Sequence, residues 1–118
     1  MRGIRVVVTG GRDFADIGLV FRELDRINVE SGIMRLAQGG AMGADECAVK
    51  WAEARQVPVV TYEAFWQAEG KAAGPLRNAR MLDAFEPDLV VAFPGGRGTA
   101  SCVSAATKRG IEVLEVRP

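Results

Sequence analysis

The chain has 118 residues, of which 48% are hydrophobic and 25% are charged, a balance typical of a globular protein. A chain of this length is expected to form a single domain over residues 1–118. Fifteen basic residues balance fifteen acidic ones, which argues against a general nucleic-acid-binding protein, because such proteins usually carry a basic surplus.

Several other classes of protein are excluded by what the sequence lacks. No apolar run approaches the ~20 residues that span a bilayer, and the first residues show no signal-peptide pattern, so we expect a cytoplasmic protein with no membrane partner. Histidine is absent, which excludes Ser-His and Cys-His catalysis within one chain. Cys47 and Cys102 lie far apart on apolar helical patterns, so we expect buried thiols and no protein-held metal.

Strand and helix patterns alternate along the whole chain. Strands are predicted at residues 4–9, 33–38, 57–61, 89–93 and 111–116. Helices are predicted after Asp16, which can cap the first, after the turn at 39–45, from Pro75 to about Phe85, and from Thr99 to Gly110. Their inward faces should carry the residues at helical spacing: Ile17, Val20, Phe21, Leu24 and Ile27; Ala44, Cys47, Ala48 and Trp51; Leu76, Ala79, Leu82 and Phe85; Cys102, Val103 and Ala106.

This alternation predicts an α/β fold of three layers, in which helices cover both faces of a five-stranded parallel sheet. Pro58 in the third strand and the glutamates of the fifth are features of sheet edges, so the strand order 3-2-1-4-5 fits best. Right-handed crossovers then place the topological switch point between the first and fourth strands.

Three glycine-rich turns follow strands and precede helices in this scheme. They contain Gly10-Gly11, Gly39-Gly40 and Gly95-Gly96 with Gly98, and the carboxyl ends of parallel strands bring them to one rim. The last turn, after the buried run at 89–93, would present backbone N–H groups at the positive end of a helix dipole. Such a turn suits phosphate or a phosphorylated sugar. None of the turns has GxGxxG spacing, and Gly70-Lys71 lacks the other residues of a P-loop.

Five segments together resemble a known superfamily. Pro94-Gly-Gly-Arg-Gly-Thr99 resembles the PGGxGT motif of the lonely-guy phosphoribohydrolases, and Arg77-Asn-Ala-Arg-Met81 resembles their arginine-bearing helix. Residues 8–14, 38–45 and 74–78 are similar to the small YspA-type branch of the Smf/DprA–lonely-guy (SLOG) superfamily. The resemblance covers nearly the whole chain and implies a Rossmann-like fold with a pocket for a nucleotide-derived ligand.

The resemblance also implies roles for individual residues. Gly95, Gly96, Gly98 and Thr99 would hold a phosphate, and Arg77 would clamp the phosphoribose end, a role that suits a planar guanidinium. Arg12 and Arg97 are second candidates for the phosphate, whereas Arg80 is expected to be a surface charge. The predicted ligand-binding set is Gly10, Gly11, Arg12, Gly39, Gly40, Gly43, Arg77, Asn78, Pro94, Gly95, Gly96, Arg97, Gly98 and Thr99.

One departure from the family pattern bears on catalysis. The hydrolases carry a glutamate shortly after the GT pair, but here Thr99-Ala-Ser-Cys102 follows with no carboxylate. Glycoside cleavage needs a carboxylate near the developing positive charge. Asp13 and Asp45 are the candidates to replace it. Asp45 is also explained by helix capping or by a hydrogen bond to ribose hydroxyls, and these alternatives stay open.

Three functions follow from these patterns. The leading one is a sensor or carrier of a nucleotide-derived ligand, which requires no cofactor, although Mg²⁺ can accompany a nucleotide. The second is an N-glycosidic hydrolase acting on a nucleoside monophosphate or an ADP-ribose-like compound. The third, single-stranded nucleic-acid binding, is disfavoured by the neutral charge. A homodimer is expected from the resemblance. Trp66 would either stack on a purine or pack on the sheet edge, and packing is favoured for Phe65.

Overall fold

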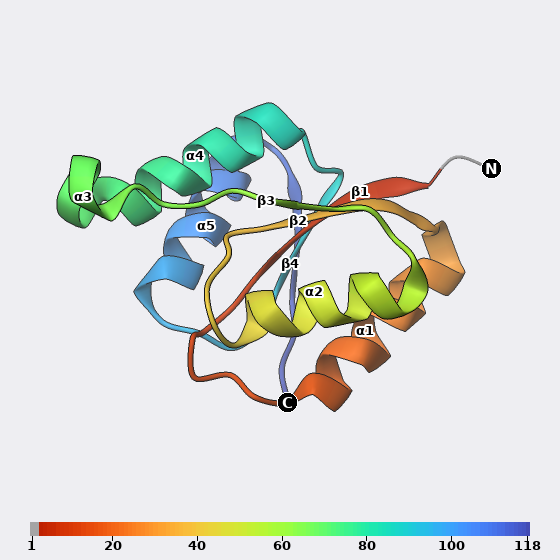
Figure 1. Ribbon diagram of the computed structural model, residues 1–118. Coiled ribbons are helices and arrows are strands. Elements are labelled where there is room, and N and C mark those ends of the chain that lie inside the picture. Colours follow the sequence, from red (N-terminus) through yellow and green to blue (C-terminus); the bar gives the residue numbers. More distant parts are fainter. Residues whose placement is uncertain (1–2) are drawn as a thin grey trace.

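The sheet has the predicted order. The computed structural model describes residues 3–118, and its five parallel strands lie in the order β3-β2-β1-β4-β5 (Figure 1). The strands are β1 Ile4–Thr9, β2 Ile33–Gln38, β3 Val59–Thr61, β4 Leu89–Ala92 and β5 Glu112–Glu115. In the centre of the sheet, Val7 of β1 pairs with Ala37 of β2 on one side and with Val90 of β4 on the other. The carboxyl ends of these three strands therefore finish at one edge.

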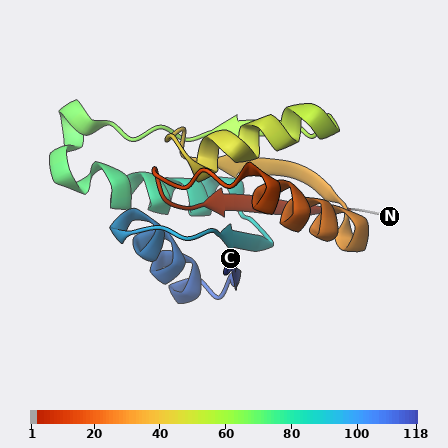
Figure 2. The same cartoon turned by 90° about the horizontal axis from the view of Figure 1, so that it is seen from below.

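Two helices cover each face of the sheet. They are α1 Ile17–Ser31 and α2 Ala44–Arg55 on one face, and α4 Ala73–Phe85 and α5 Arg97–Lys108 on the other (Figures 1 and 2). A short helix α3, Trp66–Glu69, and the 3₁₀ turn η1, Gly70–Ala72, connect β3 to α4. Both lie beyond the carboxyl ends of the strands, at one end of the molecule (Figure 1).

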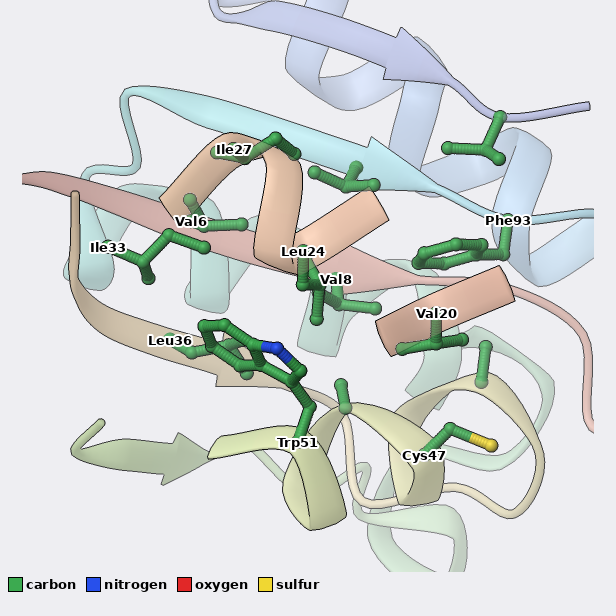
Figure 3. Packing of buried hydrophobic residues seen from close by; sticks show 14 of the residues in the cluster. Val6, Val8, Val20, Leu24, Ile27, Ile33, Leu36, Cys47, Trp51 and Phe93 are labelled. Carbon is green, nitrogen blue, oxygen red and sulfur yellow. The ribbon is translucent and has the colours of Figure 1, made fainter. Parts of the chain in front are cut away.

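The core is split by the sheet because successive side chains of a strand point to opposite faces. Val6 and Val8 face α1 and α2, where Leu24 and the fully buried Trp51 fill the layer (Figure 3). Val7 faces the other way, into the layer under α4 and α5. The Trp51 indole donates a hydrogen bond of 2.8 Å to Asp25, which satisfies its only polar group.

Most predicted elements are confirmed, with differences at helix faces and ends. Asp16 caps α1 as expected, its carboxylate accepting the Leu19 N–H at 3.0 Å. Ile17, however, is 40% exposed, because it lies before the first inward turn, whose buried residues are Leu19 and Val20. Val103 is only half-buried.

The largest difference concerns α4. The η1 turn runs directly into it, so the helix begins at Ala73 rather than at Pro75. Its buried stripe is Gly74, Asn78, Met81, Leu82 and Phe85, at helical spacing, and the predicted inward residue Leu76 lies off this stripe and is 44% exposed. Within residues 3–118, no helix combines the length and the apolar character that crossing a membrane requires.

Candidate functional site

A cleft of about 1250 Å³ lies at the carboxyl ends of the strands. Turns after β1, β2 and β4 form its walls, together with residues before and within α3 and the start of α4. Its lining includes Gly10, Gly11, Arg12, Asp13, Gly39, Gly40, Asp45, Trp66, Arg77, Pro94, Gly95, Gly96, Arg97, Gly98 and Thr99. The structure thus brings together all the predicted site residues except Gly43 and Asn78.

The three glycine-rich turns contact one another directly. The Gly11 N–H donates to the Pro94 carbonyl at 2.9 Å, which joins the first turn to the third. The Ala44 N–H donates to the Gly11 carbonyl at 3.2 Å, which joins the second turn to the first. Gly43 allows this last contact, since its φ of 77° is unfavourable for other residues and a Cβ there would collide with the Gly11 carbonyl. Gly43 therefore shapes the site from behind the cleft.

The start of α5 is an open cradle of backbone amides. Gly96 precedes the helix and no side chain caps it. Among residues 3–118, no partner accepts the N–H groups of Arg97, Gly98 and Thr99. A Cβ built on Gly96 or Gly98 would meet no atom within 4 Å, so packing within the protein does not demand glycine at either position. Free amides beside empty space at a helix N-terminus can receive an anion.

Arg77 lies in the cleft, but part of its guanidinium is used by the protein itself. Its Nη1 donates to the carbonyls of Gly39 at 2.7 Å and Tyr62 at 3.3 Å, and its Nε donates to Asn78 Oδ1 at 2.9 Å. The sequence predicted that Arg77 lies in the first turn of its helix. Because α4 begins at Ala73, Arg77 lies in the second turn instead. No residue in 3–118 accepts a hydrogen bond from Nη2, which leaves this nitrogen for a ligand.

Asn78 is a positioning residue and not part of the cleft lining. It is 3% exposed, and its Nδ2 donates to the Gly98 carbonyl at 3.3 Å while its Oδ1 accepts from Arg77. The side chain therefore ties α4 to the first turn of α5. Gln38, which the sequence analysis missed, acts in the same way on the second turn. It is buried, its Oε1 accepts the Gly40 N–H at 2.6 Å and its Nε2 donates to Thr61. The sequence signal that could have identified Gln38 is its position as a polar residue at the end of a largely apolar strand.

Asp45 is a buried carboxylate at the centre of the site. It is 5% exposed, and its Oδ2 accepts the N–H groups of Gly39 and Ala41, both at 3.2 Å. Burial raises its pKa to about 6, against the lowering effect of these hydrogen bonds and of the Arg77 charge. Asp45 therefore does not cap α2, one of the alternatives that the sequence left open, but braces the loop before that helix. The carboxylate also faces the cleft, so a bond to ribose hydroxyls stays a prediction.

The other charged candidates are exposed at the rim. Arg12 and Arg97 are both exposed and line the cleft from the first and third turns. Asp13 is exposed beside Arg12. No group of three or more His, Cys, Asp or Glu side chains within residues 3–118 could hold a metal ion. Cys47 and Cys102 are buried thiols, as predicted, and burial raises the pKa of Cys102 to about 11.

A flap formed by residues 62–72 contributes Glu63, Ala64 and Trp66 to the lining of the cleft. Arg80 of α4 holds it: its guanidinium pairs with Glu69 at 3.2 Å, donates to the Glu63 carbonyl at 3.3 Å and lies 4.6 Å from the centre of the Phe65 ring. Arg80 is thus an anchor of the flap rather than the free surface charge that the sequence suggested. Trp66 lines the cleft from the flap and is 51% exposed.

The parallel sheet, its switch point between β1 and β4 and the cleft above it define a Rossmann-like α/β protein with a candidate ligand site at the carboxyl ends of its strands. The chain belongs to the YspA, cpYpsA-related SLOG family (YAcAr), whose model matches residues 4–68. It is 38% identical over 118 residues to the Gene 61 protein of Mycobacterium phage D29, with 93% of this chain and 94% of the phage protein covered.

A more distant likeness concerns the fold alone. The crystal structure of Acinetobacter baumannii MurG superimposes with a TM-score of 0.62 at 13% identity. The match covers 95% of this chain but only 34% of the MurG chain, so the protein spans about a third of that structure. The motifs at 77–81 and 94–99 lie outside residues 4–68, which the family model matches. The match to the phage protein, by contrast, covers 93% of this chain.

Proposed function

We propose that this protein binds a nucleotide or a related phosphorylated ligand in the cleft, as a sensor or a carrier. The observation that carries this proposal is the start of α5, where three amides have no acceptor in residues 3–118 and the two neighbouring glycines leave their side-chain space empty. Arg97 on the same turn and Arg12 across the cleft add positive charge to the rim. Membership of the SLOG family agrees with a nucleotide-related ligand.

The charges of the two helix ends orient the ligand in this proposal. The first turn of α2 carries Asp45 and Glu46, which offset the helix dipole and repel an anion. The first turn of α5 has no acidic residue. The phosphate would therefore bind at α5, and the sugar hydroxyls would lie near Asp45 as hydrogen-bond donors. Mg²⁺, where present, would arrive with the phosphates of the ligand.

Calorimetric titration with AMP, ribose 5-phosphate and inorganic phosphate tests this proposal. We expect AMP to bind, and at a hundredfold excess over Kd it should stabilise the fold by about 2.7 kcal/mol, which thermal unfolding measures. Titrations with and without Mg²⁺ separate binding of the bare phosphate from binding of its magnesium complex. If none of the three compounds binds or shifts the unfolding temperature, the proposal is wrong.

A second candidate function is N-glycosidic hydrolysis, because Asp45 provides a carboxylate in the cleft with a pKa near 6. In that reaction the bond between C1′ and the base nitrogen breaks as a water molecule is consumed: C1′ gains the hydroxyl and the nitrogen gains the proton. A group that takes and gives protons near neutral pH suits such a step. Chromatography of AMP incubated with the protein would reveal free adenine, and Asp45→Asn should abolish its release, whereas Asp13→Asn tests the other carboxylate. If AMP is unchanged after prolonged incubation, the protein is not a hydrolase of AMP and the binding function is the one that stands.

A further inference from the structure

The cleft contains a large aromatic side chain that the binding of phosphate does not use. Trp66 lines the cleft and is 51% exposed, although an indole normally buries most of its surface. Its neighbour Phe65 is 54% exposed as well, but the Arg80 guanidinium lies 4.6 Å from its ring centre and Phe65 does not line the cleft. Of these two adjacent aromatic residues, only Trp66 offers its ring to a ligand.

Contacts between the flap and α4 position Trp66. Residues on both sides of it are tied to α4: Arg77 donates to the Tyr62 carbonyl, and Arg80 binds both the Glu63 carbonyl and the Glu69 carboxylate. The indole itself reaches over α4, where a Cβ built on Gly74 would stand 3.6 Å from Trp66 Cη2. A ring positioned in advance loses little freedom when a ligand stacks on it.

Helix α4 contacts both this ring and the phosphate cradle. Gly74 lies beside Trp66, and Asn78, four residues later, donates to the Gly98 carbonyl in the first turn of α5. Four residues of helix correspond to about 6 Å along the axis. Trp66 and the start of α5 therefore meet successive turns of α4 at the same cleft, as the two ends of one ligand site would. Arg77 and Asp45 both line the cleft and both bind Gly39, Arg77 at its carbonyl and Asp45 at its N–H, so the sugar would lie beside this turn.

We infer that Trp66 is the stacking surface for a planar nucleobase, so that this cleft selects nucleotides over phosphorylated sugars. The inference rests on the proposed function and deepens it. Stacking on a tryptophan tolerates any base, because every base has a π-face. Trp66 is therefore a specificity-determining residue for the class of ligand, while the choice among bases is left to their polar edges.

The test compares AMP with ribose 5-phosphate on the wild type and on Trp66→Ala, by calorimetric titration. Trp66→Ala should weaken AMP binding about tenfold to a hundredfold and change ribose 5-phosphate binding by less than about twofold. Trp66→Phe should restore most of the AMP affinity. Phe65→Ala is the matched control for loss of an aromatic side chain next to Trp66, and because Phe65 does not line the cleft, it should leave both affinities near those of the wild type. Because Trp66 lies outside the core, all variants should melt near the wild-type temperature.

Tryptophan fluorescence gives a second readout. AMP should quench the fluorescence of Trp66, whereas ribose 5-phosphate should not. Because the other tryptophan, Trp51, is fully buried, this quenching should be absent in Trp66→Phe. The inference is overturned if Trp66→Ala weakens both ligands equally, or if it leaves AMP binding unchanged. These outcomes leave the proposed function intact, since the phosphate still binds. If neither ligand binds the wild type, both proposals are wrong.

Discussion

At the scale of single residues, the site depends on a few side chains that the protein partly uses for itself. Arg77 commits Nη1 and Nε to the loops around it and leaves Nη2 for a ligand. Asp45 uses one oxygen to hold the Gly39 and Ala41 amides. Each of these groups therefore shapes the cleft and can also contact what enters it, and truncation would remove both roles together. Isosteric variants are the more informative ones.

Asp45→Asn should change how stability depends on pH. Burial raises the folded-state pKa to about 6 from the ordinary 3.8, so the folded state holds this proton more tightly than the unfolded chain. The contribution of Asp45 to the free energy of unfolding is thus highest below about pH 4. It falls as the pH rises through about 6, by at most about 3 kcal/mol. The carboxamide of the variant cannot titrate, but its oxygen can still accept the two amide hydrogen bonds.

The measurement is the unfolding free energy of both proteins in urea between about pH 4 and pH 7.5. The difference between wild type and Asp45→Asn should shift in favour of the variant as the pH rises. All other titrating groups are common to the two proteins, so their contributions cancel in this difference. A difference that does not vary with pH would mean that Asp45 titrates normally in the folded protein.

At the scale of elements, the flap at residues 62–72 is the part that depends least on the core. None of the residues of α3 and η1 is buried. Tyr62 at the start of the flap donates its N–H to the Gln38 carbonyl and packs against the core, and Arg77 and Arg80 of α4 hold the flap through hydrogen bonds and a ring contact. Such a segment opens locally at a lower free energy than the sheet. Beyond Tyr62, the position of the flap over the cleft therefore depends on polar contacts with α4 more than on burial in the core.

Arg80→Met should loosen the flap without unfolding the protein, because a half-exposed ion pair contributes no more than about 1 kcal/mol. We expect faster hydrogen exchange at residues 62–72, weaker AMP binding and unchanged binding of inorganic phosphate. Arg109→Met is the control, since Arg109 pairs with Asp83 at the other end of α4 and α5. Equal exchange at the flap in both variants would show that Arg80 does not hold it.

The elements also show how far the sequence predicts this protein. Strand order and the sites of the three turns follow from alternating patterns and from Pro58 and the glutamates of β5, because edges and crossovers obey simple rules. In α4 the inward residues Leu82 and Phe85 were predicted correctly, but its start and the exposure of Leu76 were not, because the helix begins at the η1 turn, which has no strong sequence signal. The roles of Asn78 and Arg80 were missed because both depend on contacts between segments far apart in the chain.

At the scale of the whole molecule, the fold brings together turns that are separated by 85 residues in sequence, as Gly10 and Gly95 are. The contacts between the turns are short backbone hydrogen bonds, so the cradle is formed before any ligand arrives. A preformed site of this kind favours affinity, because little ordering is left to be done on binding. The homodimer expected from the resemblance stays a prediction, which sedimentation analysis can test.

The most direct test of a phosphate cradle at α5 is the binding of AMP to Gly98→Val, compared with wild type and with Ser104→Ala, a control on the exposed face of the same helix. A Cβ built at position 98 meets no atom of other segments within 4 Å, and valine is tolerated in a helix better than glycine, so stability should not fall. Helical Cβ atoms lean toward the N-terminus, which would place the added methyl groups over the amides. We predict at least about a tenfold loss of AMP affinity with an unchanged melting temperature, whereas wild-type affinity in Gly98→Val would contradict a phosphate site at this turn.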